Sequence, residues 1–125
     1  MSDWTAEELD KIGAADELEI AALRPDGSPR PYVTIWVVRV GDDLYVRSYR
    51  GRGGGWFRSV LRRPEGRIRA GGVERRVAFE EPDGAGHDAI DRAYRAKYAA
   101  RYASSIVDPI VGPDAAAATL RLVAR

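Results

Sequence analysis

The 125-residue sequence contains no cysteine and a single histidine, His87. The absence of cysteine excludes disulfide bonds, a thiolate nucleophile and cysteine-ligated metal sites. We expect no metal site, and we expect His87 to be a surface residue at the start of a helix. No stretch reaches the ~18 consecutive apolar residues that a membrane-spanning helix needs. Any catalytic chemistry is therefore expected to depend on groups other than cysteine side chains or a metal ion.

Hydrophobic residues make up 45% of the chain, which is enough to build the core of one domain over residues 1–125. The opening stretch, MSDWTAEELDK, is polar and acidic and does not resemble a secretory signal. We therefore expect a single cytoplasmic domain that is not attached to a membrane.

Positive charge is concentrated in the middle of the chain. Residues 39–76 contain eleven arginines and four acidic residues, a local charge of +7, whereas the whole chain carries only +1. Such a concentration attracts an anionic partner, either a small phosphate-bearing molecule or a nucleic-acid backbone. The sequence pI of about 8.1 is low for a dedicated nucleic-acid-binding protein, so the small ligand is favoured.

A predicted β-hairpin lies at the centre of this basic region. Residues 33–40 and 44–49 are rich in the β-branched and aromatic types that favour strands. Both faces of the first strand are apolar, which is typical of a strand in a barrel or at a subunit interface. A two-residue turn at residues 42–43 would pair Val38 with Arg47 and direct Arg47 away from the core. A three-residue turn would invert that orientation.

A glycine-rich loop follows the hairpin, from Tyr49 to Trp56, and leads into a predicted helix over residues 56–63. Glycine lets the backbone approach a ligand closely, and a helix N-terminus presents unpaired N–H groups that suit a phosphate. The arginines that would add charge-assisted contacts are Arg47, Arg50, Arg52 and Arg58. The alternative is a flexible loop with solvated arginines, because the loop matches neither the P-loop nor the dinucleotide-binding fingerprint.

The remaining pattern predicts short strands and a few helices. The expected strands cover residues 15–23, 33–40, 44–49, 67–70, 73–80 and 119–123. The expected helices cover residues 6–12, 56–63 and 88–102, with a capping box at Thr5 and Glu8, a loop over residues 81–86, and a single turn capped by Asp114. Strands do not alternate with long helices, so an antiparallel six-stranded barrel with peripheral helices is expected, because closing a sheet removes exposed edges.

Tyrosines recur along one face of the predicted helix over residues 88–102, at Tyr94, Tyr98 and Tyr102. A tyrosine stripe at helical spacing is typical of packing rather than of a cofactor site. Lys97 lies between them, where its ammonium group would reach an acidic ligand group while its stem packs. Solvation or a structural contact is the alternative for this lysine.

Several stretches together resemble known proteins. TIWVVRVGDDLYVRSYRGRGGGW, the glycine-flanked residues 66–72 and AYRAKY resemble an uncharacterised bacterial domain family over nearly the whole chain. The order strand, strand, glycine loop, tryptophan-led helix, proline, strand is similar to split-barrel proteins that bind FMN or the deazaflavin coenzyme. These include relatives of pyridoxamine-phosphate oxidase and deazaflavin-dependent nitroreductases. The Trp-x-x-Asn helix of the deazaflavin group is matched at Trp56, whereas Ser59 and Val60 stand where its asparagine is expected.

This resemblance implies a six-stranded antiparallel split β-barrel, a homodimer with its cofactor near the interface, and an oxidoreductase that uses FMN or deazaflavin. The suggested cofactor-binding residues are Thr34, Trp36, Arg47, Ser48, Tyr49, Arg50, Gly51, Trp56, Arg58 and Lys97. The alternative is a non-catalytic domain that binds or senses a small anionic ligand on the same fold. No catalytic residue, substrate or redox partner is indicated.

Overall fold

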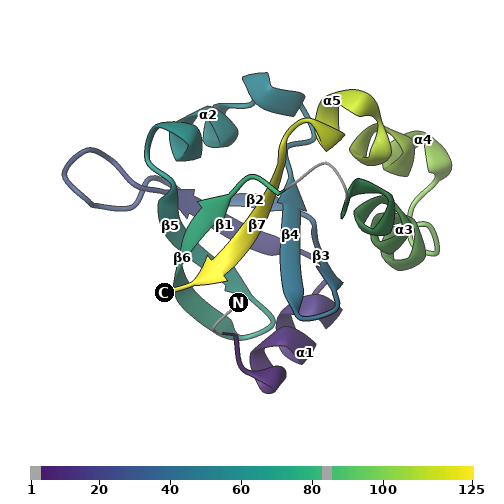
Figure 1. Ribbon diagram of the computed structural model, residues 1–125, viewed down its shortest axis with the longest axis horizontal. Helices are drawn as coiled ribbons and strands as arrows, with labels where there is room; N and C mark the ends of the chain where they lie inside the picture. Colours follow the sequence, from purple (N-terminus) through teal and green to yellow (C-terminus); the bar gives the residue numbers. More distant parts are fainter. Residues whose placement is uncertain (1–3, 83–85) are drawn as a thin grey trace.

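An antiparallel sheet of seven strands curls into a nearly closed barrel in the computed structural model, which describes residues 4–82 and 86–125 (Figure 1). The strands are β1 (Leu18–Ala22), β2 (Val33–Ile35), β3 (Val37–Val40), β4 (Asp43–Arg47), β5 (Glu65–Ala70), β6 (Val73–Glu80) and β7 (Thr119–Ala124). Their order in the sheet is β2-β1-β5-β6-β7-β4-β3. The expected antiparallel split barrel is confirmed, with seven strands in place of six.

The additional strand arises because the predicted strand over residues 33–40 is interrupted at Trp36. β2 and β3 are consecutive in the chain but lie at opposite ends of the sheet order, so the crossing at Trp36 draws the two ends together. Side chains from α3 bind the backbone beside this crossing. Val37 N donates to the Tyr98 hydroxyl group at 3.2 Å, and Lys97 Nζ donates to the Val37 carbonyl group at 2.6 Å. Buried backbone groups that lack a strand partner are thereby satisfied.

The hairpin between β3 and β4 has a two-residue turn, as predicted, but its position was wrong. The turn residues are Gly41 and Asp42, and Val38 pairs with Tyr45 rather than with Arg47. Gly41 has a φ of +61°, a conformation that glycine adopts without steric cost, which explains its place in the turn. The pairing moves by two residues, so the faces are unchanged and Arg47 points away from the barrel interior, as expected.

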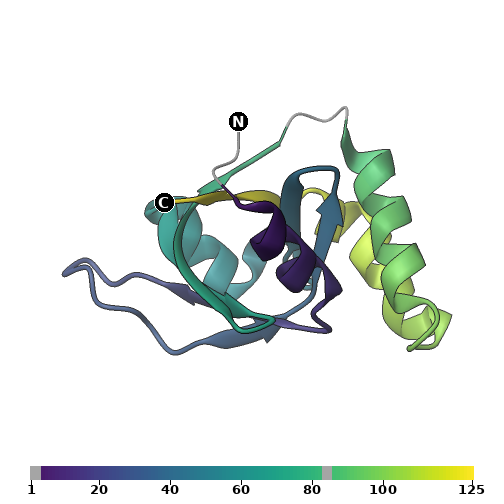
Figure 2. The ribbon, with the colours of Figure 1, turned by 90° about the horizontal axis from the view of Figure 1, so that it is seen from below.

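Helices surround the barrel on three sides (Figures 1 and 2). They are α1 (Ala6–Ala14), the 3-10 turn η1 (Gly51–Gly53), α2 (Gly55–Arg62), α3 (His87–Tyr98), α4 (Ser104–Val107), the 3-10 turn η3 (Asp108–Val111) and α5 (Pro113–Ala116). In Figure 1, α1 lies below the barrel, α2 above it, and the α3–α5 group beside β3 and β4. None of the helices in the described ranges has the length and apolar character needed to cross a membrane.

Most predicted element boundaries agree with the structure to within a few residues. The capping box of Thr5 and Glu8 is present at the start of α1. The longest helix, α3, ends at Tyr98 rather than at residue 102. Gly112, not Asp114, is the N-cap of α5, because Pro113 occupies the first helical position, where a missing N–H is tolerated. Residues 83–85 of the predicted loop lie outside the described part of the chain.

Two hydrophobic clusters hold these layers together. One fills the barrel and includes Leu18, Ile20, Val46, Ile68 and Leu122, with Phe57 and Val60 of α2 closing one end. The other joins the barrel to the α3–α5 group and contains Val38, Ile90, Tyr94, Tyr98, Val107, Ile110 and Ala115. Tyr94 and Tyr98 of the predicted tyrosine stripe therefore belong to the packing, whereas Tyr102 lies beyond the end of α3 and is exposed. Residues of β2 and of the glycine-rich loop line a common cavity.

Candidate functional site

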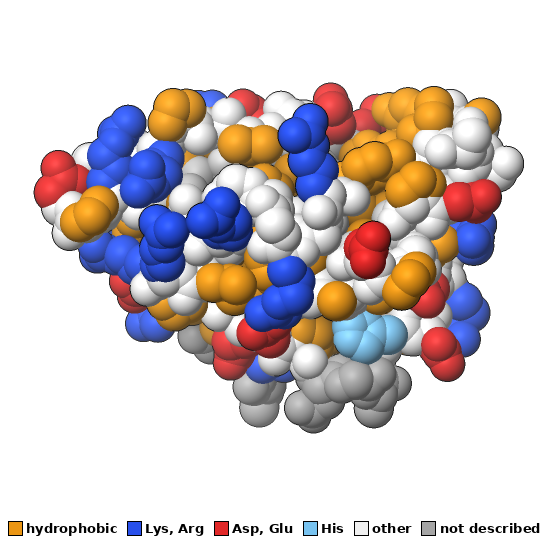
Figure 3. Space-filling model, turned by 90° about the horizontal axis from the view of Figure 1, so that it is seen from above, with side chains coloured by type: hydrophobic (Ala, Val, Ile, Leu, Met, Phe, Trp, Pro, Cys, Tyr) orange, Lys and Arg blue, Asp and Glu red, His pale blue; other side chains and the backbone are white. Residues whose placement is uncertain are grey.

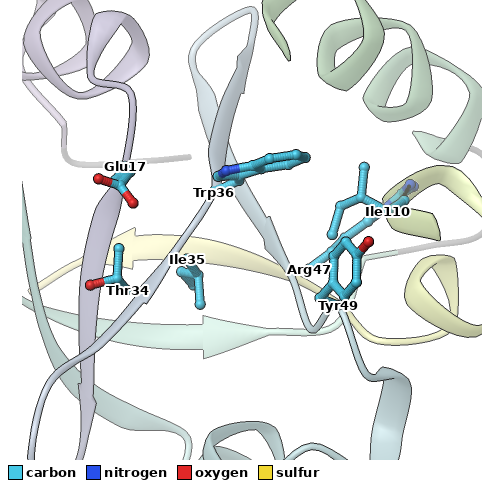
Figure 4. A pocket seen from close by; sticks show the side chains of 7 residues that line it. All are labelled: Glu17, Thr34, Ile35, Trp36, Arg47, Tyr49 and Ile110. Atoms are coloured by element: carbon cyan, nitrogen blue, oxygen red, sulfur yellow. Dashed lines mark hydrogen bonds between the residues drawn. The ribbon is translucent and has the colours of Figure 1, made fainter. Parts of the chain in front are cut away.

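Three cavities follow one another along β2, the strand at one end of the sheet order. The inner cavity, of about 200 Å³, is lined by Glu17, Thr34, Ile35, Trp36, Arg47, Tyr49 and Ile110 (Figure 4). The central cavity, of about 420 Å³, is lined by Val33, Thr34, Ile35, Ser48, Tyr49, Arg50, Gly54, Gly55 and Trp56. The outer cavity, of about 240 Å³, is lined by Ile20, Ala22, Arg30, Pro31, Val33, Gly55, Trp56 and Ser59. Neighbouring cavities share wall residues, and the three cavities are here called together the β2 groove.

The glycines of the loop have different structural roles. Gly51 has a φ of +75° and packs against the backbone of Asp114, and it lines none of the three cavities. A Cβ atom at Gly54 would lie 2.5 Å from the buried Ser48 Oγ, so this position has no room for a side chain. At Gly55 a Cβ atom would meet no atom within 4 Å. Gly55 therefore leaves open space that faces the central and outer cavities.

The N-terminus of α2 meets the groove at this open space. Gly54 is the N-cap and contributes no side-chain cap, and the first N–H bonded to it within the helix is that of Arg58, to Gly54 O at 3.0 Å. The N–H groups of the first turn have no intrahelical acceptor, and they carry a partial positive charge. Since Gly55 and Trp56 line the central cavity, this end of the helix is available to an anion in the groove.

The arginines of the glycine-rich loop and of α2 differ in the contacts that they make. Arg50 is exposed, lines the central cavity and makes no hydrogen bond or ion pair with a residue in the described ranges. Arg52 instead donates to Glu81 Oε1 at 2.5 Å and to Ala117 O at 2.8 Å. Arg58 is exposed on α2 but lines none of the three cavities. Of these three arginines, Arg50 is therefore the one that lines the groove and has no ionic partner among the described residues.

Arg47 borders the inner cavity, but its guanidinium group lies in an internal network. Its side chain is fully buried, and it donates to Asp91 Oδ1 at 2.5 Å, Thr119 Oγ1 at 2.9 Å and Ile110 O at 2.9 Å. His87 Nδ1, at the start of α3, lies 3.3 Å from the same guanidinium group. His87 starts a helix, as predicted, but it is a half-buried partner of Arg47 rather than a surface residue. These contacts tie β4 to α3, η3 and β7.

Aromatic side chains form the walls of the groove. The Trp36 ring stacks on the Tyr98 ring with 4.2 Å between centroids and 9° between planes, so one face of the indole is covered. Tyr49 is half exposed and donates from its hydroxyl group to Ile106 O at 3.1 Å. Trp56 is partly buried and lies between the central and outer cavities. Together with Thr34 and Ile35, these rings suit a planar ligand with few polar contacts.

Lys97 lies apart from the groove and lines none of its cavities. Its ammonium group donates to Val37 O, and burial lowers the pKa of Lys97 to about 8. Burial raises the pKa of the neighbouring Tyr98 to about 12, so its hydroxyl group remains protonated near neutral pH. Both side chains serve the crossing between β2 and β3.

The structure brings together most, but not all, of the predicted site residues. Those in the groove are Thr34, Trp36, Arg47, Ser48, Tyr49, Arg50 and Trp56; those outside it are Gly51, Arg58 and Lys97. Glu17, Arg30 and Gly55 also line the groove and were missed. Of these three residues, only Gly55 could have been identified from its sequence context, because it is the last glycine before a helix. In the described residues, no cluster of three acidic or histidine side chains could hold a metal ion.

Solved structures share this fold at low sequence identity. A conserved hypothetical protein from Mycobacterium tuberculosis has a TM-score of 0.71 and 17% identity, over 100% of this chain and 81% of that one. A candidate pyridoxamine 5′-phosphate oxidase from Listeria innocua has a TM-score of 0.65 and 15% identity, over 95% and 91%. An F420 reductase has a TM-score of 0.59 and 17% identity, over 93% and 90%. Other similar structures are named as FAD-binding or haem-binding proteins. These likenesses establish the split-barrel fold.

At the level of sequence, a search of curated proteins finds no match. The pattern of one family matches residues 8–122, nearly the whole chain. The chain therefore belongs to DUF2255, a family of uncharacterised proteins conserved in bacteria.

Proposed function

We propose that the β2 groove binds a flavin-type cofactor, FMN or the deazaflavin coenzyme, with its phosphate group at the N-terminus of α2. The observation that carries this proposal is the combination found in the central cavity. The first turn of α2, the open space at Gly55 and Arg50, which has no partner among the described residues, line one volume of about 420 Å³. That volume lies within the roughly 300–1,000 Å³ typical of small-molecule sites.

The residues present fit both ends of such a cofactor. Arg50 and the first turn of α2 would hold the phosphate, because charge-assisted hydrogen bonds and the helix dipole both favour an anion. Thr34, Trp36 and Tyr49 would enclose the planar ring in the inner cavity. Once bound, the cofactor would supply hydride transfer, so no protein nucleophile is needed. The proposed activity is therefore that of an oxidoreductase whose substrate is not indicated by the site.

Glu17 is the carboxylate of the inner cavity, and it is exposed at the cavity edge (Figure 4). In that place it would accept a hydrogen bond from a donor on the ring or on a substrate. Its contribution would be to orient a bound group rather than to react with it.

Binding without turnover is a second candidate function. The inner cavity, at about 200 Å³, is smaller than a typical complete ligand site and leaves little room for a substrate beside a ring. A homodimer would change this, because Val33 and Tyr49 at the groove are 41% and 49% exposed and a second copy would cover them. Reduction of the bound cofactor by a nicotinamide donor, followed by reoxidation by an added acceptor, would favour the enzyme over the binding domain.

The test is an equilibrium titration of the purified protein with FMN and with the deazaflavin coenzyme, followed by cofactor fluorescence. We expect saturable binding of one of them, weakened about tenfold or more by Arg50→Ala, because a charge-assisted hydrogen bond contributes about 1.5–3 kcal/mol. Arg67→Ala is the matched control, since Arg67 is exposed on β5 and lines none of the groove cavities. Absence of binding by both cofactors, or equal effects of the two variants, would contradict the proposal.

A further inference from the structure

We propose that the exposed side of α2, together with the connection between β1 and β2, binds the phosphate backbone of a double-stranded nucleic acid. The residues of this surface, here called the α2 arginine face, are Arg24, Arg58, Arg62 and Arg63. None of these four residues lines a cavity of the β2 groove, so the inference does not depend on the proposed function. It concerns the arginines of the basic region that the groove does not use.

The first argument is that the positive charge of this face is not neutralised. Residues 44–64 contain six arginines and no acidic residue. The arginines that contact a carboxylate closely are Arg39, Arg47, Arg52, Arg69, Arg75, Arg95, Arg101, Arg121 and Arg125. Most described arginines without any such contact lie on α2, its preceding loop or the connection between β1 and β2; these are Arg24, Arg30, Arg50, Arg58 and Arg62. Arg63 approaches Glu65 only at 3.9 Å.

This distribution changes the meaning of the overall charge. The sequence pI of about 8.1 includes the many acidic residues that pair with arginines elsewhere on the molecule. An anionic polymer responds to the local field of the surface that it approaches, not to the net charge of the chain. The low pI therefore does not describe the α2 arginine face.

The second argument is that the face is held together by contacts between its two segments. Arg63 Nη1 donates to Arg24 O at 3.1 Å and to Pro25 O at 3.3 Å, which ties the end of α2 to the connection between β1 and β2. Asp26 at the tip of this connection accepts from Ser28 N at 2.9 Å and from Ser28 Oγ at 2.6 Å, so its carboxylate is engaged locally. Figure 3 looks onto the side of the molecule that carries α2, and lysine and arginine side chains gather there toward the projecting connection.

The third argument is the chemistry of the exposed side of α2. Arg58 and Arg62 are four residues apart and exposed, so their side chains lie next to each other on the helix surface. The apolar residues Phe57 and Val60 are buried in the barrel core, so α2 has no apolar face left to insert into a lipid surface. Leu61, at 41% exposure, is the large apolar side chain that remains outside.

These properties favour a nucleic acid over a protein partner. The centre of a protein–protein interface is depleted of charged residues and enriched in aromatic ones, whereas interfaces with nucleic acids are polar and strongly positive. Guanidinium groups also match the geometry of phosphate oxygens. Single strands are commonly held by stacking of bases on aromatic side chains, and none of the four residues of the face is aromatic. A duplex bound through its phosphates is therefore the ligand that fits.

The experiment measures the affinity for a fluorescein-labelled DNA duplex by fluorescence anisotropy at several salt concentrations between about 50 and 200 mM. For wild-type protein, the logarithm of the affinity should fall with the logarithm of the salt concentration with a slope of about −3 to −4, as four phosphate contacts imply. Arg58→Ala combined with Arg62→Ala should make the slope shallower by about 2, whereas Arg58→Lys combined with Arg62→Lys should retain it, because the slope follows the number of charges.

The matched control is Arg92→Ala combined with Arg95→Ala, which removes two exposed arginines from α3 and should leave the slope unchanged. Thermal unfolding establishes that each variant is folded. Failure of wild-type protein to bind the duplex at about 50 mM salt would overturn the inference. Equal changes of slope in the α2 and α3 variants would also overturn it, because binding would then follow the total charge rather than this face.

Two further probes identify the class of partner. Under the same conditions, vesicles of phosphatidylglycerol and phosphatidylcholine and a polyglutamate peptide should bind more weakly than the duplex. Tighter binding of the vesicles would assign the face to a lipid surface, tighter binding of polyglutamate would assign it to an acidic protein, and either result would overturn the inference. The cofactor titrations test the proposed function separately, because they use the groove and not this face.

Discussion

The indole ring of Trp36 stacks on the phenol ring of Tyr98, which lies 62 positions later in the chain, with 4.2 Å between the ring centroids. The Tyr98 hydroxyl group accepts from Val37 N and donates to Asp16 O at 2.8 Å. One side chain of α3 therefore holds the point where the chain passes from one end of the sheet to the other. It also fixes the tryptophan that forms a wall of the inner cavity.

This relationship predicts that Tyr98→Phe destabilises the fold. The ring stack would be retained, but Val37 N–H would lose its acceptor, at a cost of about 1–3 kcal/mol for a buried unsatisfied group. Urea denaturation of wild-type and variant protein measures the difference. Tyr102→Phe is the matched control, because Tyr102 also contacts Trp36 but is 38% exposed. Equal losses in the two variants would show that the Tyr98 hydroxyl group has no special role.

The contact between Gly54 and Ser48 gives a second prediction. Gly54→Ala would bring a methyl group to 2.5 Å from Ser48 Oγ and should cost about 1–3 kcal/mol of stability, as overpacking typically does. Removing the hydroxyl oxygen with Ser48→Ala should restore part of that loss in the double variant. Gly53→Ala, where a Cβ atom meets nothing within 4 Å, should leave the unfolding free energy nearly unchanged. A double variant no more stable than Gly54→Ala alone would contradict the assigned clash.

The internal network of Arg47 predicts a large effect on stability. Asp91→Ala would leave the fully buried guanidinium group without its carboxylate; breaking a buried ion pair costs about 3–5 kcal/mol, and we expect the lower end of that range because the Asp91 side chain is 33% exposed. Replacing both residues, as Arg47→Met with Asp91→Ala, should cost less than the losses of the single variants Arg47→Met and Asp91→Ala added together, because no uncompensated charge remains. Chemical denaturation of the wild type, the two single variants and the double variant gives the double-mutant cycle. Additive losses would mean that the pair is not coupled. Loss of cofactor binding in Arg47→Ala would consequently report on folding as well as on the groove.

Lys97 predicts a pH dependence of stability. Burial lowers the pKa of Lys97 to about 8 in the folded protein, compared with 10.5 for an ordinary lysine. Between these values the unfolded chain binds more protons than the folded one, so stability from this group rises as the pH increases from about 8 toward 10.5. Below a pH of about 8 Lys97 is charged in both the folded and the unfolded state, so the free-energy cost of burying its charge is fully present.

The measurement is the unfolding free energy of wild-type protein and Lys97→Met at several pH values across this window. Wild type should gain stability relative to the variant as the pH rises. Lys11→Met is the control, because Lys11 is an exposed lysine of α1 paired with Glu7. A constant difference between wild type and Lys97→Met at all pH values would contradict the assignment.

Local patterns were sufficient to predict most of the fold. The capping box at Thr5, a two-residue turn after β3 and the strand β6 all depend on residues close in sequence, and they are present, although the turn lies at Gly41 and Asp42 rather than at residues 42–43. The interruption at Trp36 could not be predicted, because the apolar pattern continues through it and the break is stabilised by Lys97 and Tyr98 from α3. The position of this interruption is therefore determined by closure of the barrel rather than by local strand preference.

The candidate site was predictable to a similar extent. Arg50 and the last glycines of the loop follow from residue type and position, and they line the groove, whereas Gly51 does not. The internal hydrogen bonds of Arg47 were not predictable, since its partners Asp91 and Thr119 come from distant parts of the chain. Arg30 was missed for the same reason, because the outer cavity is lined jointly by residues at the start of β2 and by residues of α2.

The central claim is that a phosphate group binds at the N-terminus of α2, and the most direct measurement compares each coenzyme with its phosphate-free parent. For FMN the parent is riboflavin, and wild-type protein should bind FMN about tenfold or more tightly. Gly55→Val places a side chain in the open space beside the helix N-terminus and should remove most of this difference without loss of stability, whereas Gly53→Val should retain it. Equal affinity of wild-type protein for coenzyme and parent, or an unchanged difference in Gly55→Val, would contradict the claim.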